Sequence, residues 1–377
     1  MNKKEVLEIK KQFSPENCAI TRICGCYVDH EKNKQMTTKD AFLSLPEEET
    51  FKYFDIFKKT LSGSLGKNLL QMEFPLKEED TDGTQEFLLR LRNSKLKDDE
   101  LLDAFYDKII ENYVCEGNYY IVLIHAMYDI PGKTSDNMFN EDASDEVYEY
   151  LLCSICPVAL SKAGLSYNAE DNRIQDRTRD WTVNVPDKGF IFPTFTDRTE
   201  NIHEVLYYTK KTQDLQPEFI ETIFGSNIPV SADDQKEQFQ TLVSQVLGND
   251  CDYAHVYKIQ ETLSTWLDER EQDEPMSLSK RDIRVLLENS EVSAENMAQF
   301  DDIFDNVIGD HDLLAENITD IKNVKIETEQ MTVKISADQM DRIETREIDG
   351  RKYLLIEVDD QIKVNGLNTK TKGEITC

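Results

Sequence analysis

The sequence has no hydrophobic run long enough to cross a bilayer. Its longest apolar stretch, Tyr119 to Tyr128, includes His125 and falls far short of the ~20 residues that a spanning helix needs. The amino terminus is charged throughout and lacks an apolar segment of the ~7–15 residues typical of a secretory signal. We therefore expect a cytoplasmic protein with no membrane span, whose eight cysteines stay reduced.

Positive charge is also scarce. The chain has 43 Lys and Arg against 74 Asp and Glu, which gives a formal net charge of −31 over 377 residues. A charge of this sign repels nucleic acid and anionic membranes on average, so a polyanion would need a local basic patch. Acidity also keeps a protein soluble, which is the simplest interpretation of the charge. Apolar runs recur too often for a disordered chain.

Motifs of the common enzyme classes are missing. The sequence contains no His-x-x-x-His pair, no Gly-x-Ser-x-Gly elbow and no Gly-x-Gly-x-x-Gly fingerprint. The segment from Gly63 to Asn68 resembles a phosphate loop, but it has too few residues between its glycines and Asn68 replaces the Ser or Thr that binds magnesium. We therefore expect no catalytic motif and no cofactor.

Two cysteine pairs, Cys24 with Cys26 and Cys153 with Cys156, suggest a four-thiolate zinc site. However, the first pair lies on an expected strand and the second in an apolar run, whereas zinc knuckles place their ligands on polar, glycine-rich turns. Cysteines that fill the core are the simpler interpretation, and we expect no metal. Whether the two pairs meet in space stays open.

Hydrophobic periodicity divides the chain into three regions. Residues 1–212 combine helical patterns with short apolar runs bounded by turns, which predicts an α+β domain with a mainly antiparallel sheet. Residues 213–320 follow the helical period and predict a helical region. Residues 321–377 alternate as strands do, and Asp349-Gly350 is a two-residue hairpin signal, so we expect a small β-rich subdomain. A further strand is expected at residues 362–366.

The clearest strands of the first region are expected at residues 19–28, 119–124, 147–158, 189–192 and 204–208. The most regular helical spacing is that of Phe239, Leu242, Val243, Val246 and Leu247.

The densest polar cluster contains Arg173, Arg177, Arg179 and Asp180, and we group His203 with it. Arginine forks pair with carboxylates or phosphates in a bidentate manner, so this is the best candidate for a ligand-binding site. The alternative is a network of salt bridges between strands.

Four stretches resemble an uncharacterised family of Gram-positive bacterial proteins, known only as a domain of unknown function. They are Ile20 to Val28, Thr84 to Leu91, Cys153 to Val158 and Phe190 to Phe195. The similarity covers nearly the whole chain, and it implies no activity, cofactor or catalytic residue.

The order of elements is also similar to that of NdpA-type nucleoid-associated proteins. The similar segments are Gly117 to His125, Val256 to Leu267, Ser277 to Lys280, Met331 to Ile335, Arg342-Ile343 and Ile362 to Gly366. This resemblance implies association with DNA and provides no enzymatic motif.

We therefore expect a non-catalytic binding or interaction protein, and the second resemblance extends this hypothesis to nucleoid association. The partner would be nucleic acid or a protein, held through a local basic patch. For nucleic acid, the expected phosphate contacts are the segment 173–179 and the lysines of the first helix, Lys3, Lys4, Lys10 and Lys11. One alternative is an enzyme that acts on a phosphorylated or carboxylated small molecule through the arginine, aspartate and histidine cluster. Another is an acidic decoy for nucleic-acid-binding proteins.

Overall fold

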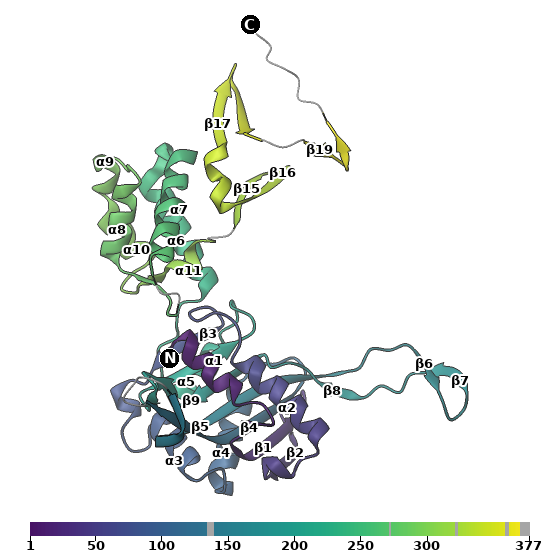
Figure 1. Cartoon of the computed structure of the whole chain (residues 1–377). Coiled ribbons are helices and arrows are strands. Elements are labelled where there is room, and N and C mark those ends of the chain that lie inside the picture. The colour runs from purple at the N-terminus through teal and green to yellow at the C-terminus, as the bar shows by residue number, and fades with distance from the viewer. Residues whose placement is uncertain (134–138, 271–272, 321–322, 359–361, 370–377) are drawn as a thin grey trace. The chain divides into compact units, whose positions relative to one another are not determined.

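The computed structural model describes residues 1–133, 139–270, 273–320, 323–358 and 362–369 (Figure 1). The chain divides into two compact units, Met1–Asp234 and Gln235–Cys377. This division differs from the expected boundary after residue 212. The helix α5, Pro217–Phe224, belongs to the first unit because Phe219, Ile220 and Phe224 are buried in the core of its sheet.

The first unit is built on an eight-stranded sheet with the order β2-β1-β4-β5-β9-β12-β3, in which β8 also pairs with β5. Every pairing between its strands is antiparallel, which confirms the expected α+β class. The strands are β1 Ile20–Val28, β2 Lys34–Asp40, β3 Leu69–Glu73, β4 Asn118–Lys133, β5 Phe139–Leu160, β8 Trp181–Val183, β9 Lys188–Phe192 and β12 Glu204–Thr209. Two smaller hairpins join β6 Leu165–Asn168 to β7 Arg173–Asp176, and β10 Thr194–Thr196 to β11 Thr199–Asn201.

Helices cover both faces of this sheet (Figure 1). On one face lie α1 Lys3–Lys11 and α2 Glu47–Thr60, and on the other lie α3 Thr84–Asn93, α4 Asp99–Asn112 and α5. Consecutive residues of β4 therefore enter different cores: Ile121 packs with α3, α4 and α5, whereas Val122 packs with α1 and α2. This explains why the strand is apolar on both sides. Two short 3₁₀ helices, Phe42–Ser44 and Leu76–Glu78, complete the unit.

The second unit has its own core, which is helical as expected. Phe239, Leu263, Leu286 and Phe300 are buried in it. Its helices are α6 Ala232–Leu247, α7 Tyr253–Asp268, α8 Lys280–Asn289, α9 Ala294–Met297, α10 Phe300–Val307 and α11 Ala315–Ile318, with 3₁₀ turns at Gly248–Asp250 and Ala337–Arg342. Among the helices of the described residues, none combines the length and apolar character that crossing a bilayer requires.

Short antiparallel hairpins follow these helices. The pairs are β13 Ser277–Leu278 with β14 Leu313–Leu314, β15 Asn323–Thr328 with β16 Met331–Ser336, β17 Ile343–Ile348 with β18 Arg351–Ile356, and β19 Lys363–Val364 with β20 Leu367–Asn368. Asp349 and Gly350 both have positive φ, 52° and 71°, as a type I′ turn needs, so the expected hairpin is confirmed. Within the expected strand at 362–366, Lys363–Val364 forms β19, which pairs with β20.

The helix α2 approaches the sheet closely at its carboxyl end. Thr60 Oγ1 lies 2.6 Å from Ser154 Oγ in β5. Gly189 in β9 makes this approach possible, because a Cβ atom there would lie 2.5 Å from the carbonyl oxygen of Cys153 and 2.6 Å from Cγ2 of Thr60. The position of α2 therefore depends on the absence of a side chain at residue 189.

We predict that Gly189→Ala lowers the free energy of unfolding by about 1–3 kcal/mol, because the added methyl group overpacks this contact. The measurement is urea denaturation followed by circular dichroism. Gly117→Ala is the matched control, since nothing lies within 4 Å of a Cβ atom there. Equal stability of the two variants would contradict the prediction.

Candidate functional site

The helices α1 and α2 lie side by side on one face of the sheet. Phe13, just after α1, packs against Phe57 of α2 with ring centroids 5.5 Å apart. Asn2 and Glu5 form a capping box at the start of α1: Asn2 Oδ1 accepts a hydrogen bond from Glu5 N at 3.0 Å, and the Glu5 carboxylate accepts one from Asn2 N at 2.7 Å. The apolar faces are therefore buried and the polar faces point outward.

Both helices end in two lysines. Lys10, Lys58 and Lys59, from the last turns of α1 and α2, form what we call the lysine patch. Partial burial, followed by the charges of Lys59 and Lys58, lowers the pKa of Lys10. Within the described residues, no acidic side chain forms an ion pair with these three lysines. Lysines in a last turn also stabilise the helix by interacting with its dipole, whether or not a ligand binds.

The acidic residues of α1 are engaged elsewhere. Arg198 Nη1 donates to both carboxylate oxygens of Glu8, at 2.9 and 2.7 Å, and the Tyr128 hydroxyl donates to Glu8 Oε1 at 2.6 Å. The buried Glu5 also accepts a hydrogen bond from the backbone N–H of Arg198 at 3.2 Å. Of the lysines expected to contact phosphate, Lys3, Lys4 and Lys11 are exposed and Lys10 is half-buried. The acids of α1 therefore do not neutralise the lysine patch.

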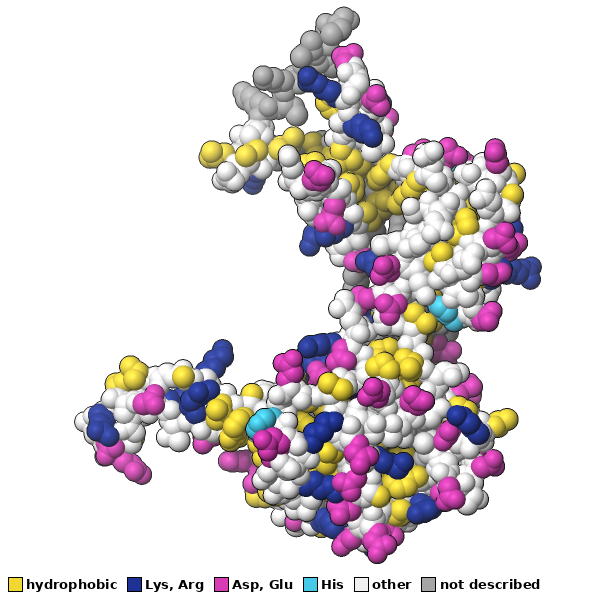
Figure 2. Space-filling view, turned by 180° about the vertical axis from the view of Figure 1, so that it is seen from behind, with side chains coloured by type: hydrophobic (Ala, Val, Ile, Leu, Met, Phe, Trp, Pro, Cys, Tyr) yellow, Lys and Arg dark blue, Asp and Glu magenta, His cyan; other side chains and the backbone are white. Residues whose placement is uncertain are grey.

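The expected arginine cluster lies on a two-stranded ribbon, residues 159–185, which we call the ribbon arm (Figure 2). Arg173 Nε donates to Gln175 Oε1 at 2.9 Å, and Arg179 Nε donates to the carbonyl oxygen of Ser161 at 2.8 Å. Backbone hydrogen bonds join Arg177 N to Gly164 O at 2.9 Å. The arginines thus contact groups of the arm itself.

Asp180 and His203 complete the expected set. Asp180 N donates to Ser161 Oγ at 3.1 Å, within the ribbon arm. His203 lies just before β12, and its Nδ1 is 2.8 Å from Glu79 Oε1. Among the described residues, no hydrogen bond or ion pair joins His203 to Arg173, Arg177 or Arg179.

The four cysteines with candidate metal-ligand spacing are buried. Leu123 of β4 pairs with Cys24 on one side and with Cys153 on the other, so an intervening strand separates the two pairs by roughly 9–10 Å between backbones. Burial raises the pKa of both Cys24 and Cys26 to about 11. Across the described parts of the chain, no group of three or more His, Cys, Asp or Glu is placed to hold a metal.

His125 is a buried titratable residue at the centre of the sheet. Its Nδ1 lies 2.8 Å from Thr21 Oγ1, and its Nε2 lies 3.6 Å from Glu149 Oε2. Lys95 Nζ reaches the other carboxylate oxygen of Glu149 at 3.4 Å. Burial lowers the pKa of His125, and the charge of Glu149 opposes this effect. The imidazole is therefore neutral near pH 7.

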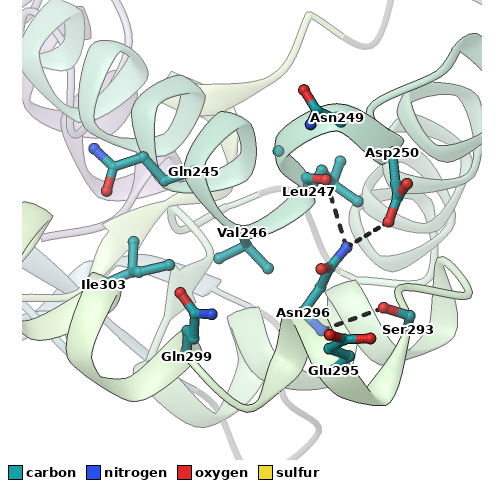
Figure 3. A pocket seen from close by; sticks show the side chains of 11 residues that line it. Gln245, Val246, Leu247, Asn249, Asp250, Ser293, Glu295, Asn296, Gln299 and Ile303 are labelled. Atoms are coloured by element: carbon teal, nitrogen blue, oxygen red, sulfur yellow. Dashed lines mark hydrogen bonds between the residues drawn. The ribbon is translucent and has the colours of Figure 1, made fainter.

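A polar cavity of about 320 Å³ lies at the carboxyl end of α6 in the second unit (Figure 3). Asn296 points toward α6, and its Nδ2 donates to the Leu247 carbonyl at 3.4 Å and to Asp250 Oδ2 at 3.1 Å. The lining is otherwise dominated by amide and carboxylate side chains: Gln245, Asn249, Glu295 and Gln299. None of the described residues that line this cavity is basic, so it does not attract anions.

The model of a protein family described as a domain of unknown function, DUF4317, matches residues 1–367. The chain belongs to this family. The match covers nearly the whole chain, as expected from the sequence, and extends over most of both units. No curated protein matches the chain. The family description of this DUF4317 protein therefore assigns it no activity, and its function has to be inferred from its geometry.

Two members of the lysine patch, Lys58 and Lys59, were not predicted from the sequence. Their signal is the Lys-Lys pair at the end of the second helix, which repeats the pair Lys10-Lys11 at the end of the first. The pattern becomes meaningful only when the two helix ends are known to be neighbours.

We predict that acid destabilises the protein through His125. Because its pKa is lower in the folded state than the ~6.5 of the unfolded chain, the unfolded chain binds the proton first. The stability that the neutral imidazole provides is complete above about pH 6.5 and declines as the pH falls below that value. We expect urea denaturation between about pH 5 and 8 to show that the free energy of unfolding falls more steeply with decreasing pH for the native chain than for His125→Gln. Parallel curves for the two proteins would contradict this prediction.

Proposed function

We propose that this protein is a non-catalytic binding protein that contacts the phosphates of nucleic acid through the lysine patch. The observation that supports this proposal is the convergence of Lys10, Lys58 and Lys59, which have no acidic partner among the described residues, in a chain whose formal charge is −31. Lysines placed together in this way repel one another, and a bound phosphate would relieve that repulsion. Lys3, Lys4 and Lys11 on α1 would extend the contact.

The overall negative charge does not prevent such contact at physiological salt. The Debye length is about 8 Å at an ionic strength of 0.15 M, so exposed acidic residues farther than this from the phosphate are largely screened. Lysines that touch a phosphate still release counterions, and each contact contributes about −0.9 to the slope of log affinity against log salt concentration. Three contacts predict a slope of about −3.

The sequence resemblance to NdpA-type nucleoid-associated proteins would favour DNA in particular. The segments of this chain that carry it, residues 117–125, 256–267 and 277–280, lie at β4, at α7 and before and at the start of α8. A cytoplasmic location in a Gram-positive bacterium, as expected from the sequence, is compatible with this role.

The alternative, an enzyme for a phosphorylated or carboxylated small molecule, has less support. It requires Arg177, Arg179, Asp180 and His203 to converge on one ligand. Arg177, Arg179 and Asp180 are exposed on the ribbon arm, whereas His203 pairs with Glu79. The lysines of the lysine patch, in contrast, already lie close together.

We predict that the native protein binds short double-stranded DNA at low salt, measured by fluorescence anisotropy. The variant Lys10→Gln/Lys58→Gln/Lys59→Gln should lose about tenfold or more in affinity, and its salt slope should be smaller in magnitude by about 3. The helix-dipole role of these lysines is checked by circular dichroism, which should show a folded variant.

The matched control is Lys97→Gln/Lys211→Gln/Lys236→Gln, which removes three exposed lysines from other parts of the chain. It changes the net charge by the same amount, so the affinity of the control should stay within about twofold of the native value. No binding by the native protein at low ionic strength, or equal losses in the two triple variants, would refute the proposal.

A further inference from the structure

The ribbon arm is a two-stranded structure that leaves the sheet of the first unit (Figure 1). At its base, Leu160 of β5 pairs with Trp181 of β8, and beyond them Ser161 N donates to Asp180 O at 2.8 Å. The outer part is the β6–β7 hairpin, in which Tyr167 pairs with Ile174. An isolated two-stranded ribbon is at best marginally stable in water, because it has no second layer to pack against.

Large apolar side chains of the arm are exposed. Leu165 is 76% exposed, Tyr167 61%, Ile174 62% and Trp181 56%. Leu165 and Tyr167 are two residues apart on β6 and Ile174 lies directly opposite Tyr167, so these three share one face of the hairpin. Tyrosine, tryptophan and arginine are also the residues most enriched at the centres of protein–protein interfaces.

The charge of the arm identifies the partner. Residues 159–185 contain four basic side chains, Lys162, Arg173, Arg177 and Arg179, and four acidic ones, Glu170, Asp171, Asp176 and Asp180. The net formal charge of the arm is therefore zero, and the formal charge of −31 comes entirely from residues outside it. Figure 2 shows both charge types interleaved with hydrophobic side chains along the arm.

This neutrality favours a second copy of the chain over a polyanion. Two copies of this acidic chain repel each other. Contact through their neutral arms adds less electrostatic repulsion than contact through acidic surface would. A two-fold contact presents the same surface from both copies, so it needs both signs of charge on one surface to form complementary pairs. Nucleic acid gains no net attraction from a surface with equal numbers of acids and bases.

We propose that two copies of this protein associate through their ribbon arms. The faces that carry Leu165, Tyr167 and Ile174 pack together, and the arginines of each arm pair with the carboxylates of the other. This contact supplies the packing layer that each ribbon lacks alone. The proposal is independent of the lysine patch, whose residues lie on α1 and α2.

Sedimentation velocity of the full chain tests the proposal. The native protein should form a dimer with a dissociation constant below ~0.1 mM. Tyr167→Ser/Ile174→Ser should raise the dissociation constant about tenfold or more. The matched control, Leu43→Ser/Leu76→Ser, removes two exposed leucines outside the arm and should change it less than twofold.

A charge exchange excludes local unfolding of the arm as the explanation. The variants Arg173→Glu/Arg177→Glu and Asp176→Lys/Asp180→Lys should each be monomeric alone at the concentration where the native chain is dimeric. An equimolar mixture of the two should restore the dimer. A monomeric native protein, a dimer that survives the arm substitutions, an equal loss in the leucine control, or a mixture that stays monomeric would overturn the proposal.

Discussion

The first unit depends on the pairing of β4 with β5 in the middle of its sheet. The two strands pair from Asn118 with Val158 to Lys133 with Phe139. Both are covered on both faces, so the outer strands and the five helices are arranged around this pair. The buried polar residues His125 and Ser154 are tolerated there because each is hydrogen-bonded, His125 to Thr21 and Ser154 to Thr60.

Outside this buried centre, the lysine patch and the ribbon arm differ in charge from the acidic chain as a whole. The lysine patch is positive because the acids of α1 bond to Arg198, to Tyr128 and to the helix amino terminus. The ribbon arm is neutral because its acids and bases are equal in number. A strongly acidic protein repels other polyanions, and contact with them is least unfavourable where that repulsion is absent.

Much of the fold could be predicted from the sequence because the elements with strong periodicity are buried. The strand at 119–124, the helical spacing from Phe239 to Leu247 and the Asp349-Gly350 turn all correspond to elements of the structure. The helix α3 was not predicted because its apolar residues, Phe87, Leu88, Leu89 and Leu91, lie in one short stretch that does not repeat the helical spacing. The strands β6 and β7 were missed because each has only four residues, too few for the alternation of Leu165 and Tyr167 to be distinguished from a loop.

Only some residues of the candidate site could be predicted from the sequence. Lys10 and Lys11 could be identified because they end an amphipathic helix, whereas Lys58 and Lys59 join them through the packing of Phe13 on Phe57. Residues far apart in the sequence come together here through tertiary contacts, and local patterns contain no information about such contacts. For the same reason, the sequence could not show that His203 pairs with Glu79 and not with the residues around Arg177.

Gly189 links the interior of the sheet to the outer surface of α2. Thr60 packs closely against this glycine. The distance between the carboxyl end of α2 and the sheet, and with it the position of Lys58 and Lys59, therefore depends on the strand backbone at Gly189. Under the proposed function, residues that never meet a ligand would thus tune how this charged surface fits a polymer with regularly spaced phosphates. Variation at such supporting positions would let related chains adjust their preferred partner while leaving every contacting side chain unchanged.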